Sequence, residues 1–370
     1  MVCSLDKPTA IDGTLSLKII VVDTTGTLPC NPNYGFVRVD HARVKIKSTD
    51  YDFFLEFFTD ENGELVVENL LASHYQVAID KQVPTDDLND FTNLVLTGSL
   101  DCNICPTNQG KTDTIKMDIA VLSNVVINEI YYTGVTLNNY PYLDDQFVEL
   151  YNNSDKTLYL DSIILARMSI NIDYIGTDYV EVVYAYQFPG KGHQCPIQPG
   201  ELIVIAQDAI DHREVVPRSI DLSDADYECW NEPGNDIGGK AINLLPLNPN
   251  YKNDFMMNTL IDAILLIKMK NTKELKFNHK GYMLFKVTDV IDGVKYASSS
   301  ETERYLDPWI DAGHAGDGIH KFSGESIERH HPVTGEPGYD TNNSSFDFVS
   351  LFHPTPGYQH CVEDVIRSLF

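Results

Sequence analysis

The sequence predicts an all-β protein built from two antiparallel β-sandwiches. Three observations lead to this prediction. Short runs that alternate between polar and apolar residues recur along the chain, as in half-buried strands. Clusters of Asp, Asn and Gly separate these runs and favour turns. The first 122 residues contain no amphipathic helix of convincing length.

The acidic composition narrows the range of partners. The 370 residues include 54 acidic and 27 basic residues, which gives a formal net charge of −27. A surface of this sign repels phosphate backbones, so nucleic-acid binding is not expected. No apolar run approaches the roughly 20 residues of a membrane-spanning helix. The longest such run, at 260–270, is interrupted by Asp262 and Lys268.

Residues 1–11 are expected to form a tether. They open with Met1-Val2-Cys3-Ser4 and continue as a short polar leader, which resembles the mature end of a bacterial lipoprotein. On this interpretation the Cys3 thiol carries the lipid, and the protein meets a membrane only through that anchor. The alternative is that Cys3 is incidental.

The cysteine count fits an oxidising compartment if Cys3 is lipidated, because an even number then remains. We expect a disulfide between Cys195 and Cys229, and a second one that joins Cys30 to Cys102 or to Cys105. Buried, unpaired thiols are the alternative. The remaining cysteines are Cys30, Cys102, Cys105, Cys195, Cys229 and Cys361.

Residues 12–122 are predicted to form the first sandwich. Strands are expected at 15–23, 42–48, 74–80 and 113–122. Residues 53–70 are expected to form a β-hairpin around the turn at 60–63, because Asn-Gly supplies the positive φ that such turns need.

The run TDENGE at 59–64, with Asn69-Leu70 and Tyr75-Gln76-Val77 after it, resembles the core of carboxypeptidase-regulatory-like, transthyretin-like domains. The resemblance implies that Tyr75 packs against the core and that the domain is a spacer or adaptor. Ser73-His74 stands where that family usually has glycine.

Residues 123–362 are predicted to form the second sandwich, which opens with strand signals at 125–130, 146–152 and 158–165. An ordered series of motifs runs through it: NEI (128–130), VELYN (148–152), LDSI (160–163), PGELIVIA (199–206), DAILL (262–266), DGVKY (292–296), SIER (326–329), NSSFDF (343–348) and PTPG (354–357). These motifs resemble the lamin-tail domain, which implies an immunoglobulin-like sandwich.

The second domain is longer than a typical lamin-tail domain. Two insertions, near 169–194 and 207–260, account for much of the excess, and residues 363–370 form a C-terminal tail. Ligand or partner surfaces usually lie on such insertions. The two modules together resemble an uncharacterised family of Bacteroidetes surface lipoproteins. That resemblance implies an accessory of a TonB-dependent outer-membrane uptake receptor, either on the outer face of the outer membrane or in the periplasm.

Aromatic residues are the predicted ligand contacts. Tyrosines crowd the loop near 131–142 and the first insertion, where they could stack on a glycan or on a protein partner. The alternative is that they cover the edge of the sandwich. The candidates are Tyr140, Tyr142, Tyr184, Tyr186 and Trp230.

Two groups of residues are weighed as metal ligands. Asp144 and Asp145 are a candidate calcium site, whereas Glu149 is expected to accept hydrogen bonds from neighbouring backbone. Histidines in the C-terminal third, with Asp311 and Asp317, could hold a transition metal, but their spacing matches no common zinc pattern. These histidines are His314, His320, His330, His331, His353 and His360.

Enzymatic signatures are weak. The glycine-rich run at 234–241 has Ala241 where a phosphate-binding loop needs Ser or Thr, so nucleotide binding is not expected. No G-x-S-x-G motif is present. The leading hypothesis is therefore a non-enzymatic surface lipoprotein that binds a ligand or partner. No cofactor is expected, and calcium is the alternative. The alternatives are an extracellular metal-assisted hydrolase and a polysaccharide-binding adhesin or scaffold.

Overall fold

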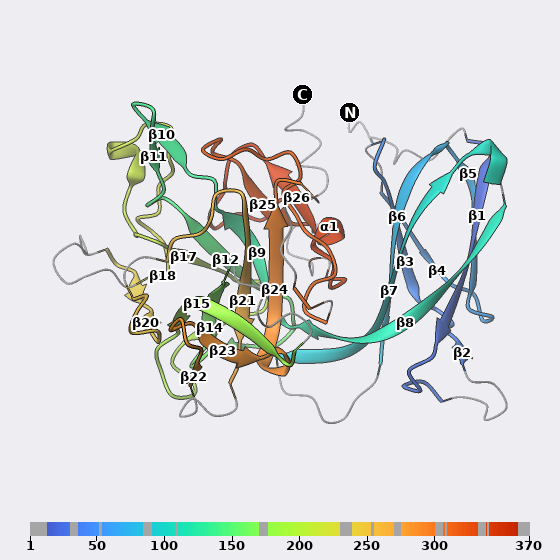
Figure 1. Cartoon of the computed structure of the whole chain (residues 1–370), viewed down its shortest axis with the longest axis horizontal. Helices are drawn as coiled ribbons and strands as arrows, with labels where there is room; N and C mark the ends of the chain where they lie inside the picture. Colours follow the sequence, from blue (N-terminus) through green and yellow to red (C-terminus); the bar gives the residue numbers. More distant parts are fainter. Residues whose placement is uncertain are drawn as a thin grey trace, which may run out of the picture. The chain divides into compact units, whose positions relative to one another are not determined.

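The computed structural model describes residues 13–29, 36–51, 54–83, 91–108, 110–169, 177–229, 239–252, 255–269, 275–299, 306–307, 309–331, 338 and 340–361. The tether at 1–11 and the tail at 363–370 lie outside these residues. The chain divides into two compact units, which are Met1–Asp87 with Asn93–Ala120, and Leu88–Thr92 with Val121–Phe370. Both are built almost entirely from strands (Figure 1).

The first unit is an eight-stranded sheet with the order β2-β1-β8-β7-β6-β3-β4, in which β5 also pairs with β1. Its strands alternate inward and outward residues, and apolar side chains from six of them form one core. The elements are β1 (Leu15–Asp23), β2 (Val37–Arg38), β3 (Arg43–Ser48), β4 (Phe54–Phe58), β5 (Glu64–Leu70), β6 (Ser73–Gln82), β7 (Thr92–Ile104), the 3-10 turn η1 (Pro106–Asn108) and β8 (Lys111–Ser123).

The prediction that 53–70 form a hairpin is wrong, although the predicted turn at 60–63 is present. Gly63 has a φ of +66° and its N–H donates to the carbonyl of Asp60 at 2.9 Å. However, β4 pairs with β3, and β5 pairs with β1. The turn therefore carries the chain between two distant places in the sheet. Tyr75 is fully buried in the core, as the sequence implied.

Strand β7 was not predicted, and Gly98 lies in the middle of it. A Cβ at Gly98 would lie 2.9 Å from the Ile115 side chain and 3.0 Å from the sulfur of Met117, both on β8. Glycine is thus required here for the close approach of a neighbouring strand.

The second unit consists of two seven-stranded sheets. The first has the order β19-β18-β17-β12-β9-β25-β26, and the second has β22-β23-β15-β14-β21-β24, with β20 also paired to β15. The first-sheet strands are β9 (Val125–Tyr131), β12 (Phe147–Asn152), β17 (Leu202–Ala206), β18 (Tyr227–Glu228), β19 (Ile242–Asn243), β25 (Ser326–Arg329) and β26 (Phe348–Leu351). The second-sheet strands are β14 (Ile164–Met168), β15 (Tyr179–Gln187), β20 (Leu245–Pro246), β21 (Ile261–Ile267), β22 (Lys276–Phe277), β23 (Met283–Lys286) and β24 (Val290–Ala297).

Smaller elements complete the second unit. They are the hairpin strands β10 (Val135–Leu137) and β11 (Tyr140–Tyr142), the pair β13 (Leu158–Tyr159) and β16 (Pro196–Ile197), the 3-10 turns η2 (His212–Glu214) and η3 (Val287–Asp289), and helix α1 (Ser344–Asp347). In the described part of the chain, no helix is both long and apolar enough to span a membrane.

The main core of the second unit takes apolar side chains from both sheets. Val148, Leu150 and Ile327 contribute from the first sheet, and Ile264 and Leu266 from the second. A smaller cluster, which includes Phe147, Ala206 and Leu222, covers the opposite face of the first sheet. That face therefore carries buried residues as well, which is why β9 and β12 are buried at every position.

Both stretches predicted as insertions are built into the sheets. Strand β15, within 169–194, lies between β14 and β23. Strands β18, β19 and β20, within 207–260, extend both sheets, and Tyr227, Leu244 and Phe255 enter the main core. Removing 207–260 would therefore disrupt the sandwich.

We expect Leu150→Ala to lower the free energy of unfolding by about 2–5 kcal/mol, because it leaves a cavity in the core between the sheets. Leu245→Ala is the matched control. Since Leu245 is 50% exposed, this control should change the free energy by about 0.5 kcal/mol or less. Urea unfolding measures both, and equal effects would contradict the placement of the core.

Candidate functional site

Three glutamates lie side by side in the middle of the first sheet of the second unit. Glu129 on β9 is directly opposite Glu149 on β12 and Glu328 on β25. Because their neighbours Ile130, Val148 and Ile327 face the main core, strand alternation points these carboxyl groups to the opposite face. All three side chains are buried. We call Glu129, Glu149 and Glu328 the glutamate row.

Residues 355–360 supply hydrogen-bond donors to each member of the glutamate row. The N–H of Thr355 donates to Glu129 at 3.2 Å, and that of Gly357 donates to Glu149 at 2.6 Å. The N–H of His360 donates to Glu328 at 3.1 Å, and its Nδ1 lies 2.8 Å from the second oxygen of Glu328. The expectation that Glu149 accepts backbone hydrogen bonds is thus confirmed.

A β-bulge adds an amide to this network. The register between β12 and β9 shifts so that Asn128 is the extra residue. Its Nδ2 donates to Glu149 at 2.8 Å, and its Oδ1 lies 2.7 Å from Nε2 of the buried His331. Because of the bulge, the Asn128 side chain donates a hydrogen bond to Glu149 on the neighbouring strand.

Burial raises the pKa of all three glutamates. The pKa of Glu129 is well above its ordinary value because of burial and the nearby charges of Glu149 and Glu328. Burial raises the pKa of Glu149 to about 8, against hydrogen bonds from Gly357 and Asn128. Burial also raises the pKa of Glu328, and the hydrogen bond with His360 opposes that rise. Glu129 and Glu149 therefore keep their protons at neutral pH.

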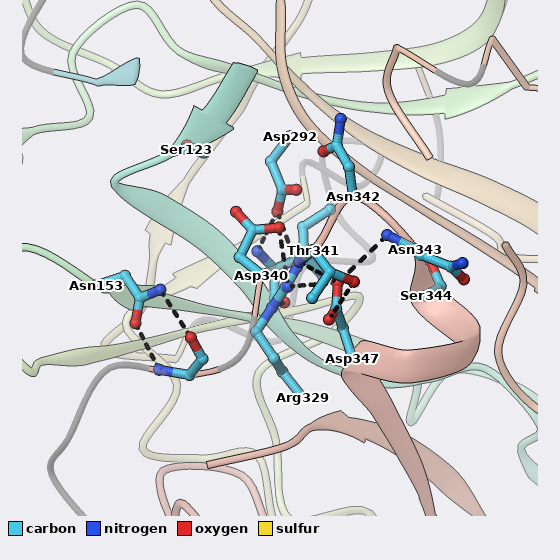
Figure 2. Close-up of polar contacts among 12 residues, drawn as sticks. Ser123, Asn153, Asp292, Arg329, Asp340, Thr341, Asn342, Asn343, Ser344 and Asp347 are labelled. Carbon is cyan, nitrogen blue, oxygen red and sulfur yellow. Dashed lines mark hydrogen bonds and ion pairs between the residues drawn. The ribbon is translucent and has the colours of Figure 1, made fainter. Parts of the chain in front are cut away.

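A second buried network surrounds Arg329 (Figure 2). Its guanidinium lies 3.5 Å from Asp292, 3.4 Å from Asp340 and 3.7 Å from Asp347. Asp292 belongs to β24 of the second sheet and accepts the N–H of Ile127, on β9, at 2.6 Å. Arg329 and Asp292 thus join the two sheets. Burial raises the pKa of Asp292 to about 7, although the charge of Arg329 opposes the rise.

A cluster of tyrosines lies on the second sheet. Tyr184 on β15 contacts Tyr251, with ring centroids 5.8 Å apart, and Tyr251 contacts Tyr282 at 5.6 Å. All three residues are partly exposed. Phe255 packs beneath Tyr184 and the fully buried Tyr186. We call Tyr184, Tyr251 and Tyr282 the tyrosine cluster.

Two asparagines fix the segments that carry these tyrosines. The fully buried Asn248 donates from Nδ2 to the carbonyls of Val183 and Gly281, at 2.9 and 3.1 Å. Asn278 accepts the N–H of Tyr282 at 3.0 Å and donates to Glu181 at 2.8 Å. The three segments therefore meet in one defined arrangement.

The other predicted aromatic contacts differ in exposure. Tyr140, on the β10–β11 hairpin, is 75% exposed, whereas the Tyr142 hydroxyl lies 2.7 Å from Nδ1 of the buried His212. Tyr186 is fully buried, so its prediction as a ligand contact is wrong; it packs in the main core. Trp230 lies outside the described residues.

The predicted calcium ligands do not converge. Asp144 is exposed, whereas Asp145 is fully buried and accepts hydrogen bonds from Tyr131 at 3.0 Å and Ser219 at 2.5 Å. Among the described residues, no three or more His, Cys, Asp or Glu side chains are placed to hold a metal ion. His331 and His360 instead bind Asn128 and Glu328, and His314 pairs with Asp317 at 2.9 Å.

The predicted disulfides are wrong, because the described cysteines are free thiols. Cys195 is a thiol that donates to the Pro189 carbonyl at 3.1 Å, so it forms no disulfide with Cys229. Both sulfurs lie in the apolar core, where cysteine packs as a small apolar residue. Cys102 and Cys105 are thiols as well, and burial raises the pKa of Cys102 to about 11. Cys3, Cys30 and the glycine-rich residues 234–238 lie outside the described residues.

Several residues of these networks were not predicted as site residues. Glu129, Glu328 and Arg329 were recognised in the NEI and SIER motifs, but a motif does not show that its acids share one sheet face. Glu181 and Tyr251 had no signal beyond their residue type. Their positions depend on pairings between distant strands.

One protein-family model matches part of the chain, and the function of that family is unknown. The family model "Protein of unknown function (DUF4876)" matches residues 198–355. Among solved structures, the chain is similar to a DUF4876 family protein from Bacteroides thetaiotaomicron VPI-5482. The TM-score is 0.57 and the identity 20%, over 90% of this chain and 94% of that chain. At 20% identity, this similarity shows only that the two chains share a fold.

A second solved structure is more distant. It is a fimbrial assembly protein from Parabacteroides distasonis ATCC 8503, with a TM-score of 0.18 and 14% identity over 50% of this chain and 85% of that chain. No curated protein matches the sequence.

We expect the stability of the second unit to fall as pH rises from about 4.5 to about 8. Below this window Glu149 is protonated in both the folded and unfolded states. Within it, the unfolded state loses a proton that the folded state keeps, so unfolding becomes more favourable. One such proton corresponds to about 1.4 kcal/mol per pH unit. Glu149→Gln should flatten the decline in urea unfolding across this range.

Glu214→Gln is the control for the pH series, because Glu214 is exposed. It should leave the wild-type slope unchanged. If Glu149→Gln also left the slope unchanged, Glu149 would not hold a proton at neutral pH.

We expect Arg329→Met to lower the free energy of unfolding by about 3–5 kcal/mol, because it leaves buried acids without their cation. Arg213→Met removes a mostly exposed arginine from Asp211 and Asp221 and should cost about 1 kcal/mol or less. Thermal and urea unfolding compare the two variants. A similar loss of free energy in both variants would show that the buried Arg329 network stabilises the fold no more than an exposed ion pair does.

Proposed function

We propose that this protein is a non-catalytic, lipid-anchored cell-surface protein that binds a ligand or protein partner through its second unit. The observation that carries the proposal is the tyrosine cluster, in which partly exposed tyrosines from three distant segments are held in place by Asn248 and Asn278. Preorganised aromatic surfaces of this kind are typical of binding sites.

The buried acids support binding rather than catalysis. Each carboxyl group of the glutamate row accepts a hydrogen bond from the chain's own backbone. Asp292 and Asp347 likewise accept backbone N–H groups, and both face Arg329. Acids that are satisfied in this way stabilise the fold.

The remaining parts of the proposal come from the sequence. Cys3 would carry a lipid, the transthyretin-like first unit would act as a spacer, and the lamin-tail-like second unit would present the binding surface. The partner would be a TonB-dependent type of outer-membrane receptor, and the protein would lie on the outer face of the membrane or in the periplasm. The net charge of −27 fits a solvated location of this kind.

Two variants of the natively expressed protein test the proposal. We expect Cys3→Ser to move the protein from the membrane to the soluble fraction, because it removes the lipid attachment site. We expect one outer-membrane receptor to co-purify with the wild-type protein, and much less of it with Tyr251→Ala. Fractionation and mass spectrometry after gentle solubilisation measure both.

Exposed Val66 lies in the first unit, so Val66→Ala is a suitable control and should retain the receptor. If the Cys3→Ser protein stayed in the membrane, the lipid anchor would be ruled out. Recovery of the wild-type protein without a receptor would rule out the transport partner.

A further inference from the structure

We infer that the tyrosine cluster is a carbohydrate site that takes an uncharged sugar ring. This inference rests on the proposed binding function and specifies its ligand. It uses residues that lie far apart in the sequence, namely Tyr184 and Glu181 on β15, Tyr251 after Asn248, and Tyr282 before β23.

The aromatic part of the site suits the C–H face of a sugar. The Tyr184 and Tyr251 rings meet at an angle of 71°, and those of Tyr251 and Tyr282 at 46°. Their centroids are 5.6–5.8 Å apart, so the rings contact each other and leave no room for a group between them. A ligand must therefore lie across the cluster rather than inside it.

The polar part of the site suits hydroxyl groups. Glu181 is almost fully buried and accepts a hydrogen bond on Oε2 from Asn278. Its Oε1 has no hydrogen-bond donor among the described residues. A buried carboxylate oxygen without a donor is unfavourable. A sugar hydroxyl is a donor of the kind that this oxygen lacks. Asn278 links this acid directly to the turn that carries Tyr282.

The negative charge of the protein favours uncharged sugars over acidic ones. Glu181 at the site and the net charge of −27 both disfavour carboxylated or sulfated glycans. Arg167 lies 5.4 Å from the centroid of the Tyr184 ring, but its Nε is paired with Asp262 at 2.5 Å. Arg167, which lies over the Tyr184 ring, is thus already neutralised, and we infer that an uncharged ligand fits best.

The site is formed before a ligand arrives. Asn248 ties the Tyr251 segment to the carbonyls of Val183 and Gly281, and the Leu247 N–H donates to the Ala185 carbonyl at 2.9 Å. The Tyr282 side chain lies against Tyr251 and raises its pKa. A rigid aromatic surface loses little conformational freedom on binding.

An array of neutral and acidic oligosaccharides, probed with the full chain, tests the inference. We expect binding to neutral oligosaccharides, and the strongest of these is then titrated by calorimetry. Tyr251→Ala and Tyr282→Ala should each weaken binding by about tenfold, because each removes a stacking ring. Tyr251→Phe keeps the ring and should bind within about threefold of wild type. Glu181→Gln should weaken binding, because an amide N–H₂ replaces an acceptor.

Tyr140→Ala is the matched control, since Tyr140 is exposed but lies on the β10–β11 hairpin, and it should bind as wild type does. Near-UV circular dichroism establishes that each variant is folded. Binding confined to acidic glycans, binding insensitive to Tyr251→Ala, or no glycan binding at all would each overturn the inference. If a receptor still co-purified from membranes in the last case, the proposed binding function would stand without the sugar.

Discussion

The second unit depends on acids that are removed from water and satisfied by its own backbone. Placing like charges directly opposite each other across strands is unfavourable, and burying them is more so. The glutamate row does both at the centre of a sheet. It is tolerated because Glu129 and Glu149 retain protons and because residues 355–360 bring an N–H to each of the three carboxyl groups. Arg329 in turn offsets the negative charges of three buried aspartates, Asp292, Asp340 and Asp347.

These networks account for the sequence pattern that suggested the fold. The NEI, VELYN, SIER and PTPG motifs are far apart in the sequence, yet Glu129, Glu149, Glu328 and Thr355 meet in one network. An acid in the middle of a strand that is otherwise apolar is costly unless specific partners are present. Such a motif therefore identifies a fold more reliably than it identifies a chemical activity.

Local sequence predicted strands well and their pairing poorly. Strand β1 begins and ends where the alternation of 15–23 placed it, because one face of that strand is buried. The hairpin at 53–70 failed, since pairing is decided by tertiary contacts beyond the turn. The exposure of Tyr140 and the burial of Tyr186 could not be distinguished either, because residue type says nothing about which face of a sheet a side chain occupies.

The glutamate row also constrains the order in which the chain can become native. Glu129 and its partner Thr355 are 226 residues apart, and Glu149 and Gly357 are 208 apart. Contacts of this separation form late, because closure of so long a loop opposes them. A chain that emerges from a ribosome from its N-terminus would expose three uncapped acids at the centre of a sheet until residues 355–360 arrive. Those acids would favour an open, hydrated sheet over premature compaction until synthesis has passed residue 360.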